Sequence, residues 1–211
     1  DDPRPLFNRS VDPKADDSSL RTFTAEAQKL LLANSISPIP LHKSIVLRDC
    51  ILARRRGVYR NHELLALIKA VVEQSSNLHF GPEVGVRNPK KDAAVIGPWL
   101  EEIQIVSEHL RELNECPDVP SVVFHSDSRK ADELLEPASI DAVITSPPYP
   151  NEKDYTRTTR LESVLLGLVA NKTELRDLKK TLLRSNTRGV YKEDDDDRWI
   201  VGRSDQLGDS S

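Results

Sequence analysis

The stretch SIDAVITSPPYPNEKDYTRTTRLESV, residues 139–164, decides how the rest of the chain is interpreted. Its first part, IDAVITS (140–146), is a short β-branched run that predicts a buried strand. Two prolines and an aromatic residue follow directly, as Pro147, Pro148 and Tyr149. Because proline fixes φ and has no N–H to donate, the strand must end where the prolines begin. A plain turn requires neither the second proline nor the ring.

The segments around this stretch predict the fold class. SVVFHSD (121–127) is another short β-branched and aromatic run, and SRKADELLEP between the two runs has room for one short helix. Helices are predicted over 160–169 and 171–183, the second with Asn171 and Glu174 spaced as in a capping box. Strand, helix, strand, loop and helix in this order are typical of an α/β fold with a parallel sheet.

The chain before this α/β part predicts a mainly helical region. Helical patterns cover 24–34, 40–56, 61–74 and 98–113, whereas 81–97 is broken by Gly and Pro and predicts a long ordered loop. The ends of the chain are polar and charged. The predicted domains are therefore a flexible arm (1–21), a helical region (22–118), part of an α/β domain (119–190) and an acidic, polar, mobile tail (191–211).

Single residues set the expected helix boundaries and faces. Asn34 is a plausible stop, Pro40 occupies a favoured first-turn position, and Asn61 is a candidate N-cap. The apolar residues expected on one face of each of the two longer amphipathic helices are Leu64, Leu65, Ile68, Val71 and Val72 in the first, and Trp99, Ile103, Val106, Leu110 and Leu113 in the second.

Composition excludes several classes of protein. The net charge of −4 argues against coating nucleic acid by global charge, although a local basic groove stays possible. No apolar run is long enough to span a bilayer, so the sequence predicts no membrane partner and a cytoplasmic protein. Cys50 and Cys116 are interpreted as buried free thiols rather than a disulfide, and no metal site is predicted.

The end of the predicted strand 140–146 offers a set of groups for a planar ligand. In open parallel sheets, ligands bind beyond the carboxyl ends of the strands. Ser146 would supply a hydroxyl, the proline-fixed carbonyl of Pro147 an acceptor, and Tyr149 a flat face for stacking. An amino-substituted heterocycle would suit this set. The alternative is a rigid connector in which the prolines shape a loop and Tyr149 packs on its neighbour.

The residues TSPPY resemble the catalytic motif of the amino-methyltransferases that modify exocyclic nitrogens of DNA bases. Ser146, Pro147, Pro148 and Tyr149 match its four positions: a polar residue, two prolines and an aromatic residue. The longer run ITSPPYPNEKDYTRTTRLE and the stretch SSNLHFGPEVGV (75–86) are similar to bacterial site-specific DNA methyltransferases. The resemblance implies a partial Rossmann-like methyltransferase sheet, S-adenosyl-L-methionine as cofactor and double-stranded DNA as partner.

The resemblance also implies base flipping and direct methyl transfer. The hydroxyl of Ser146 and the carbonyl of Pro147 would accept the two amino protons of the extruded base, and Tyr149 would stack on its ring. These hydrogen bonds would favour a pyramidal nitrogen with its lone pair aimed at the methyl donor. Serine at the first motif position favours cytosine N4 over adenine N6.

Other residues receive expected roles with alternatives left open. Asp127, with Ser146, is the candidate for binding the cofactor; an ordinary loop cap is the alternative for Asp127. Lys153, Arg157 and Arg160 are candidates for contacting DNA phosphates or ordering a loop over the base, and a solvated helix start explains them equally well. The basic run at 53–56 fits the favourable charge at a helix C-terminus better than a phosphate site.

One signature of the family is absent. The glycine-rich loop that wraps the cofactor in similar enzymes requires a G-x-G pattern, and none occurs among the 8 glycines. The chain also contains no methionine, which favours a piece of a longer protein with the loop elsewhere. The chain is expected to hold the catalytic motif and part of the cofactor site, and could be inactive by itself. The alternative is a non-catalytic DNA-recognition or assembly module whose partner chain, or the missing remainder, supplies the loop.

Overall fold

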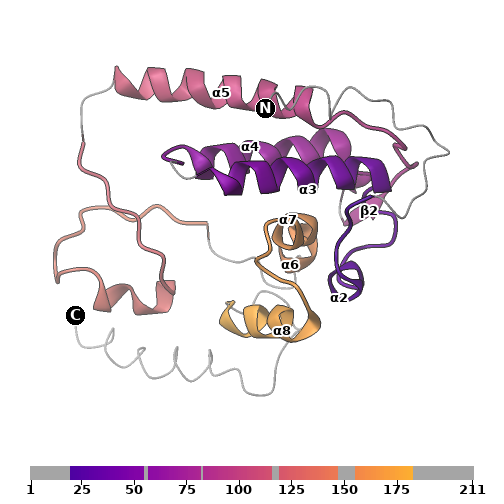
Figure 1. The fold of residues 1–211 in the computed structure, drawn as a ribbon. Helices are drawn as coiled ribbons and strands as arrows, with labels where there is room; N and C mark the ends of the chain where they lie inside the picture. The colour runs from indigo at the N-terminus through magenta and orange to yellow at the C-terminus, as the bar shows by residue number, and fades with distance from the viewer. Residues whose placement is uncertain (1–19, 55–56, 82, 116–118, 147–154, 183–211) are drawn as a thin grey trace. The chain divides into compact units, whose positions relative to one another are not determined.

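The computed structural model describes residues 20–54, 57–81, 83–115, 119–146 and 155–182 (Figure 1). The chain forms two compact units, one from residues 1–118 with 157–174, the other from 119–156 with 175–211. The second unit therefore interrupts the first in sequence. Nearly all of the predicted arm, and the whole of the predicted tail, lie outside the described residues.

The first helix, α2 (Ala25–Gln28), is a single turn. The side chain of Thr24 caps it by accepting a hydrogen bond from the Ala27 N–H at 3.2 Å. The prediction of a helix over 24–34 was therefore wrong in length. The chain turns after α2 because Leu30 and Ser35 are buried, and Asn34 adopts a left-handed φ of 62°, which asparagine tolerates better than most residues.

The next helix, α3 (Pro38–Ala53), begins two residues before the predicted Pro40. Pro38 is its first residue, where a missing N–H costs no helical hydrogen bond. Leu41, Ile45 and Ile51 face the core. Cys50 is free, as predicted, but exposed, because it lies beside this buried face rather than on it; the prediction of a buried thiol was wrong for it. Cys116 lies outside the described residues.

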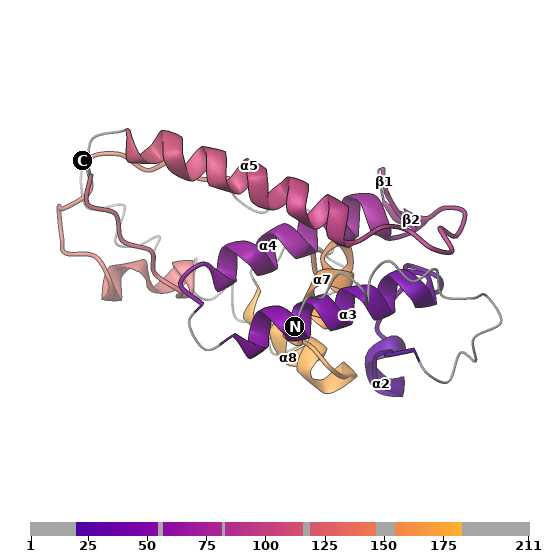
Figure 2. The same ribbon diagram turned by 45° about the horizontal axis from the view of Figure 1, so that its top comes forward.

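Helix α4 (Arg60–Ala70) continues into a π-helical turn, η2 (Val71–Ser75). It starts one residue before the predicted N-cap Asn61. Its predicted face was partly wrong: Val71 is buried, but Leu65 is 63 % exposed, whereas Ala66, Leu67 and Ala70 are buried. The reason is that α4 packs against both α3 and α5 (Figures 1 and 2). Small alanine side chains let neighbouring helices approach closely on two sides.

The longest helix, α5 (Ile96–Asn114), confirms the helix predicted over 98–113. Four of its five predicted seam residues are half-buried, and only Leu113, at 64 %, is exposed. The Trp99 Nε1–H donates to the Glu63 carbonyl at 3.0 Å, which fixes α5 against α4. Glu102 is buried on the same helix and pairs with Lys69 of α4 at 2.9 Å. This pairing raises the pKa of Lys69 through a hydrogen bond and a favourable charge contact.

A small hairpin lies where a loop was predicted. Strand β1 (Leu78–Phe80) pairs antiparallel with β2 (Val84–Val86), with His79 opposite Gly85. The prediction of an irregular loop over 81–97 was therefore wrong for β2. Strands of three residues carry too little alternation to be read from a sequence.

Three short helices follow the motif. They are α6 (Tyr155–Thr158), α7 (Arg160–Leu165) and α8 (Lys172–Thr181). Leu161, Val164 and Leu165 bury one side of α7. The predicted capping box of α8 is confirmed, because the Glu174 N–H donates to Asn171 Oδ1 at 3.0 Å and the Asn171 side chain donates back to Glu174 at 2.6 Å.

The two strands predicted over 121–127 and 140–146 are not formed. In the described part of the chain the sheet consists of β1 and β2, and both predicted strand segments have no regular structure and are largely exposed, with Val123 at 95 % and Ile144 at 99 %. The expected short helix between them is present as a 3₁₀ turn, η3 (Ser128–Glu133). A β-branched run specifies burial in a sheet, but a strand forms only where neighbouring strands supply its hydrogen bonds. The partial Rossmann-like sheet is thus not confirmed.

Candidate functional site

The predicted catalytic motif is described only at its first residue. Ser146 is exposed at the end of a segment without regular structure. Pro147, Pro148, Tyr149 and Lys153 lie outside the described residues, so their predicted roles remain predictions.

The predicted cofactor residue Asp127 is half-buried at the end of the other segment without regular structure. Its carbonyl accepts the Lys130 N–H at 2.9 Å and so begins the η3 turn. This position fits the loop-cap alternative, and the cofactor role stays a prediction.

The two described arginines that were expected to contact DNA have different surroundings. Arg157 of α6 is exposed, and its Nη1 pairs with Glu83 Oε2 in the hairpin turn at 3.1 Å. Arg160 of α7 is half-buried and donates to the Leu30 carbonyl at 3.2 Å. Arg160 therefore joins α7 to the turn after α2, whereas the guanidinium of Arg157 remains accessible to solvent.

A second arginine anchors the segment after the motif to the helical region. Arg48 of α3 donates through Nη1 to the Leu165 carbonyl at the end of α7, at 2.8 Å. Its Nε and Nη2 both donate to Asp49, whose other oxygen accepts from Arg21 at 2.8 Å. A fork of this kind holds the guanidinium in one orientation. The end of α7 is therefore fixed on α3 by a polar contact as well as by apolar packing.

The stretch SSNLHFGPEVGV, whose resemblance was noted in the sequence, contains a buried hydrogen-bonding centre at Asn77. This side chain is 1 % exposed. Its Nδ2 donates to the Asn34 carbonyl at 2.8 Å and to Ser37 Oγ at 3.2 Å, and its Oδ1 accepts the Lys90 N–H at 2.7 Å. The main chain of Asn77 makes two further hydrogen bonds, each 2.8 Å long. The Asn77 N–H donates to the Ser35 carbonyl, and the Asn77 carbonyl accepts the Arg87 N–H.

Asn77 thus holds together the turn after α2, the hairpin and the loop that follows the hairpin. Sequence reasoning assigned it no role, although a polar triplet directly after a helical run is a possible signal. The two serines before it also donate hydrogen bonds to main-chain carbonyls. Ser76 Oγ donates to the Val72 carbonyl of the π-helical turn at 2.7 Å, and Ser75 Oγ donates to the Ala94 carbonyl in the loop before α5, also at 2.7 Å.

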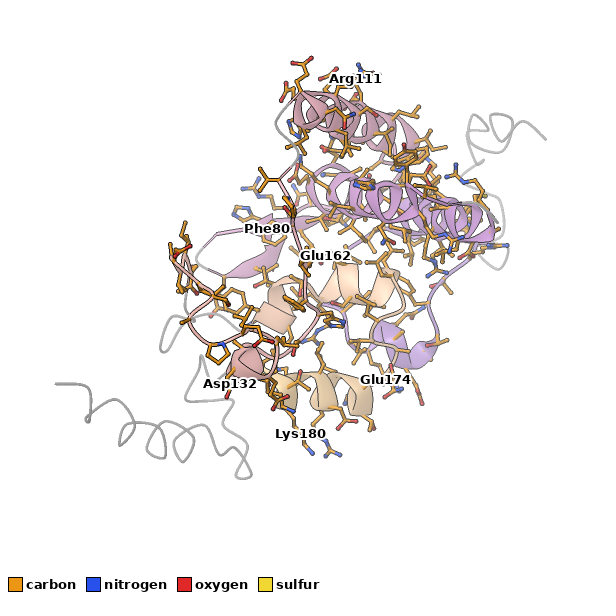
Figure 3. The ribbon with its side chains drawn as sticks, turned by 90° about the vertical axis from the view of Figure 1, so that its left-hand side faces the viewer. Phe80, Arg111, Asp132, Glu162, Glu174 and Lys180 are labelled. Atoms are coloured by element: carbon orange, nitrogen blue, oxygen red, sulfur yellow. The ribbon has the colours of Figure 1, made fainter. Side chains whose placement is uncertain are left out.

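Glu162 of α7 carries an unusual carboxyl group (Figure 3). Its Oε2 is buried and has no hydrogen-bond partner among the described residues. Burial removes water from the charged form and raises the pKa of Glu162, while a backbone hydrogen bond lowers it less strongly. Glu162 lies on α7, the helix whose end Arg48 contacts. It follows Tyr149, the last residue of the motif at 146–149, by thirteen residues.

The raised pKa of Glu162 predicts a pH effect on stability. A carboxyl whose pKa is higher in the folded state binds protons more tightly there, so its contribution to stability falls as pH rises from the ordinary glutamate range through the raised value. Glu162→Gln keeps the shape and removes the charge. It should raise the melting temperature at pH 7 relative to wild type, by an amount that shrinks towards pH 4. Because the group is only partly buried, solvent screening keeps this gain small.

Thermal unfolding of both proteins between pH 4 and pH 7 measures this effect. Glu101→Gln, at an exposed position on α5, is the matched control and should show no comparable pH-dependent difference. A Glu162→Gln protein that is less stable than wild type at pH 7 would show that the carboxylate is stabilised by a charge partner.

Neither a metal cluster nor a membrane span is found in the parts that the structure describes. No group of three or more His, Cys, Asp or Glu side chains there is arranged to hold a metal ion. No helix in those ranges has both the length and the apolar character needed to cross a bilayer.

Comparison with known proteins gives one informative match. The chain is similar to a methyltransferase. It is 33 % identical over 131 residues, or 61 % of its length, to the Type II methyltransferase M.BsoBI of Geobacillus stearothermophilus. It spans about a quarter of the length of that curated relative. No family model matches the chain, and no solved structure matches it.

The match to the Type II methyltransferase covers more than half of the chain. A similarity over 131 residues cannot rest on the tetrapeptide at 146–149 alone, because more than half of the chain takes part. It supports a methyl-transferring enzyme as the kind of protein to which this chain is related. S-adenosyl-L-methionine is the general cofactor of such enzymes.

Proposed function

We propose that the chain is part of a site-specific DNA methyltransferase, which transfers a methyl group from S-adenosyl-L-methionine to the exocyclic amino group of a flipped base. The proposal is carried by two signals together. One is the four-residue motif Ser146–Tyr149, and the other is the similarity to a Type II methyltransferase over 61 % of the chain.

The proposed chemistry assigns a task to each motif residue. An aromatic amino group is a poor nucleophile because its lone pair is delocalised into the ring. Ser146 Oγ and the Pro147 carbonyl would accept its two protons and favour a pyramidal nitrogen. Pro148 would hold the backbone rigid, and Tyr149 would stack on the extruded base. Cytosine N4 is favoured over adenine N6 because the motif begins with serine.

The residues present fit the cofactor only in part. A carboxylate at Asp127 and a hydroxyl at Ser146 are suitable acceptors for the amino and hydroxyl groups of a nucleoside. Residues 1–211 contain no G-x-G pattern for a loop around its amino-acid end. The cofactor supplies an electrophilic methyl group when bound, and the chain would orient the acceptor nitrogen towards it.

One observation favours a second candidate, a recognition or assembly module that depends on another polypeptide. The segments around Val123 and Ile144 are exposed and form no strands within the described residues. A parallel sheet would require additional strands beside them. In this alternative a partner chain completes the sheet and supplies the glycine-rich loop.

Cofactor binding separates the two candidates. Isothermal titration calorimetry of the chain with S-adenosyl-L-methionine is expected to show binding if the cofactor site is autonomous. If the chain is a recognition or assembly module, no cofactor binding is expected without a second polypeptide. Incubation with DNA and cofactor, followed by mass analysis of the nucleosides, then identifies the base. Methyl-cytosine at N4 is the expected product. Methylation of RNA only would contradict the proposal.

A further inference from the structure

We propose that the polar face of the β1–β2 hairpin, formed by His79, Gly85 and Arg87, together with Lys91 in the loop after it, contacts the phosphate backbone of double-stranded DNA. This inference rests on the proposed function, because it takes DNA as the substrate. It adds a phosphate-binding surface outside the motif at 146–149, carried by the helical unit of the chain.

The register of the hairpin separates its two faces. Leu78 lies opposite Val86 and Phe80 opposite Val84, so these four apolar residues share one face. His79 and Gly85 lie opposite each other on the other face. Arg87 follows β2, and its Nη2 reaches the Nε2 of His79 at 3.2 Å. One face is therefore apolar and the other carries an imidazole and a guanidinium.

The charges on this surface are not neutralised by acids. Arg21, Arg54 and Arg157 each pair with a carboxylate. The guanidinium of Arg87 has only the imidazole of His79 as its partner within the described ranges. An imidazole carries no negative charge, so the full charge of the arginine remains available.

Lys91 supplies a second free cation. It is exposed and makes no ion pair or hydrogen bond among the described residues. The neighbouring carboxylate of Asp92 does not neutralise it, because Asp92 already pairs with Lys43. Arg87 and Lys91 are thus two cations close in sequence that have no acidic partner among the described residues, in a chain of net charge −4.

Gly85 leaves strand β2 open opposite His79. A Cβ built at this position would meet no atom within 4 Å. A ligand can therefore approach the backbone of β2 directly, which is one reason for glycine inside a strand. Phosphate oxygens accept hydrogen bonds from arginine, lysine and imidazole groups, and this surface provides all three.

The surface is held in place by the buried Asn77. The Asn77 carbonyl accepts the Arg87 N–H, and its Oδ1 accepts the Lys90 N–H. Lys90 Nζ also donates to the Gln74 carbonyl at 2.7 Å. Both ends of the segment 87–90 are thus tied to the core. A charge held in this way loses less conformational freedom on binding than one on a free loop.

The test compares two double variants of the full chain that each remove two positive charges. Arg87→Gln with Lys91→Gln changes the proposed surface. Lys29→Gln with Arg111→Gln is the control, at two exposed positions, of which Arg111 lies in the last turn of α5 (Figure 3). Binding of a short DNA duplex is followed by fluorescence anisotropy between about 50 mM and about 200 mM salt.

The hairpin variant should bind about tenfold or more weakly at ~0.1 M salt, with a salt slope smaller by about 2, whereas the control should stay near wild type. Arg87→Lys should retain most of the affinity because it keeps the charge. The inference would be overturned if both double variants lost the same affinity for the duplex, or if the hairpin variant bound as tightly as wild type. It would also be overturned if wild type bound no duplex at the lowest salt. An effect confined to single-stranded RNA would overturn it as well. Circular dichroism and thermal unfolding verify that the variants are folded.

Methylation measured in the same samples separates this inference from the proposed function. Weaker duplex binding without methylation by any protein would retain the surface and count against the enzyme activity. Normal methylation with unchanged duplex binding by the hairpin variant would support the enzyme activity and count against the proposed surface.

Discussion

Tyr149→Ala is expected to slow methyl transfer by about 10- to 100-fold. Base–aromatic stacking contributes about 1–3 kcal/mol per base, and each 1.4 kcal/mol corresponds to about a tenfold change in rate. Loss of the ring should leave the extruded base poorly held, so that its amino nitrogen spends less time in line with the methyl donor. The rate of methyl incorporation into duplex DNA measures this effect, with the chain by itself or together with the polypeptide that completes the enzyme.

Two further variants make this result interpretable. Tyr149→Phe keeps the flat face and should retain most of the rate. Tyr59→Ala removes an exposed tyrosine from the start of α4 and should have no effect on methyl transfer. If the Tyr149→Ala protein transfers methyl groups at a near-normal rate, stacking on Tyr149 is not part of the mechanism.

Asn77→Ala is expected to lower the free energy of unfolding by about 3 kcal/mol. The substitution removes the partners of the Lys90 N–H and the Asn34 carbonyl, and each buried group left without a hydrogen bond costs about 1–3 kcal/mol. It also leaves a void in a fully buried position. Urea unfolding followed by circular dichroism measures the change.

Asn88→Ala is the matched control for this substitution. Asn88 is exposed in the loop that Asn77 anchors, so its replacement should change stability by less than about 0.5 kcal/mol. Asn77→Asp should remain strongly destabilised, because a carboxylate cannot donate to the Asn34 carbonyl. Equal stability of the Asn77→Ala and Asn88→Ala proteins would show that the hydrogen bonds of Asn77 are replaced by others.

The elements that sequence reasoning identified are those with local signals. Helix α8 carries its own capping box in Asn171 and Glu174, and α5 carries a sustained apolar period from Trp99 to Leu110. The start of α3 was missed by only two residues, because either of two prolines suits a first turn. In these cases neighbouring residues contain the information that fixes the element.

The elements that were missed depend on distant parts of the chain. The apolar period of α4 pointed to Leu65, yet two flanking helices select Ala66 and Ala70 for burial instead. The runs at 121–127 and 140–146 have the composition of strands, but no strand pairs with them in the described ranges. Composition specifies that such a run suits a sheet, whereas the sheet itself requires partners. The motif signal at 146–149 was readable for a different reason, since it depends on residue identity rather than on packing.

The contact between Arg48 and Leu165 has a consequence for how the protein folds during synthesis. It joins positions 117 residues apart, and the first segment of the second compact unit, Val119–Thr156, is translated between them. The first unit therefore cannot complete its core when α2 to α5 have left the ribosome, because Leu161 and Leu165 of α7 have not yet been made. Its helices must wait, partly packed, while the interrupting segment emerges. The cost of closing so long a loop grows only with the logarithm of its length, so the interrupting segment could lengthen or shorten over evolution with little penalty to the helical unit.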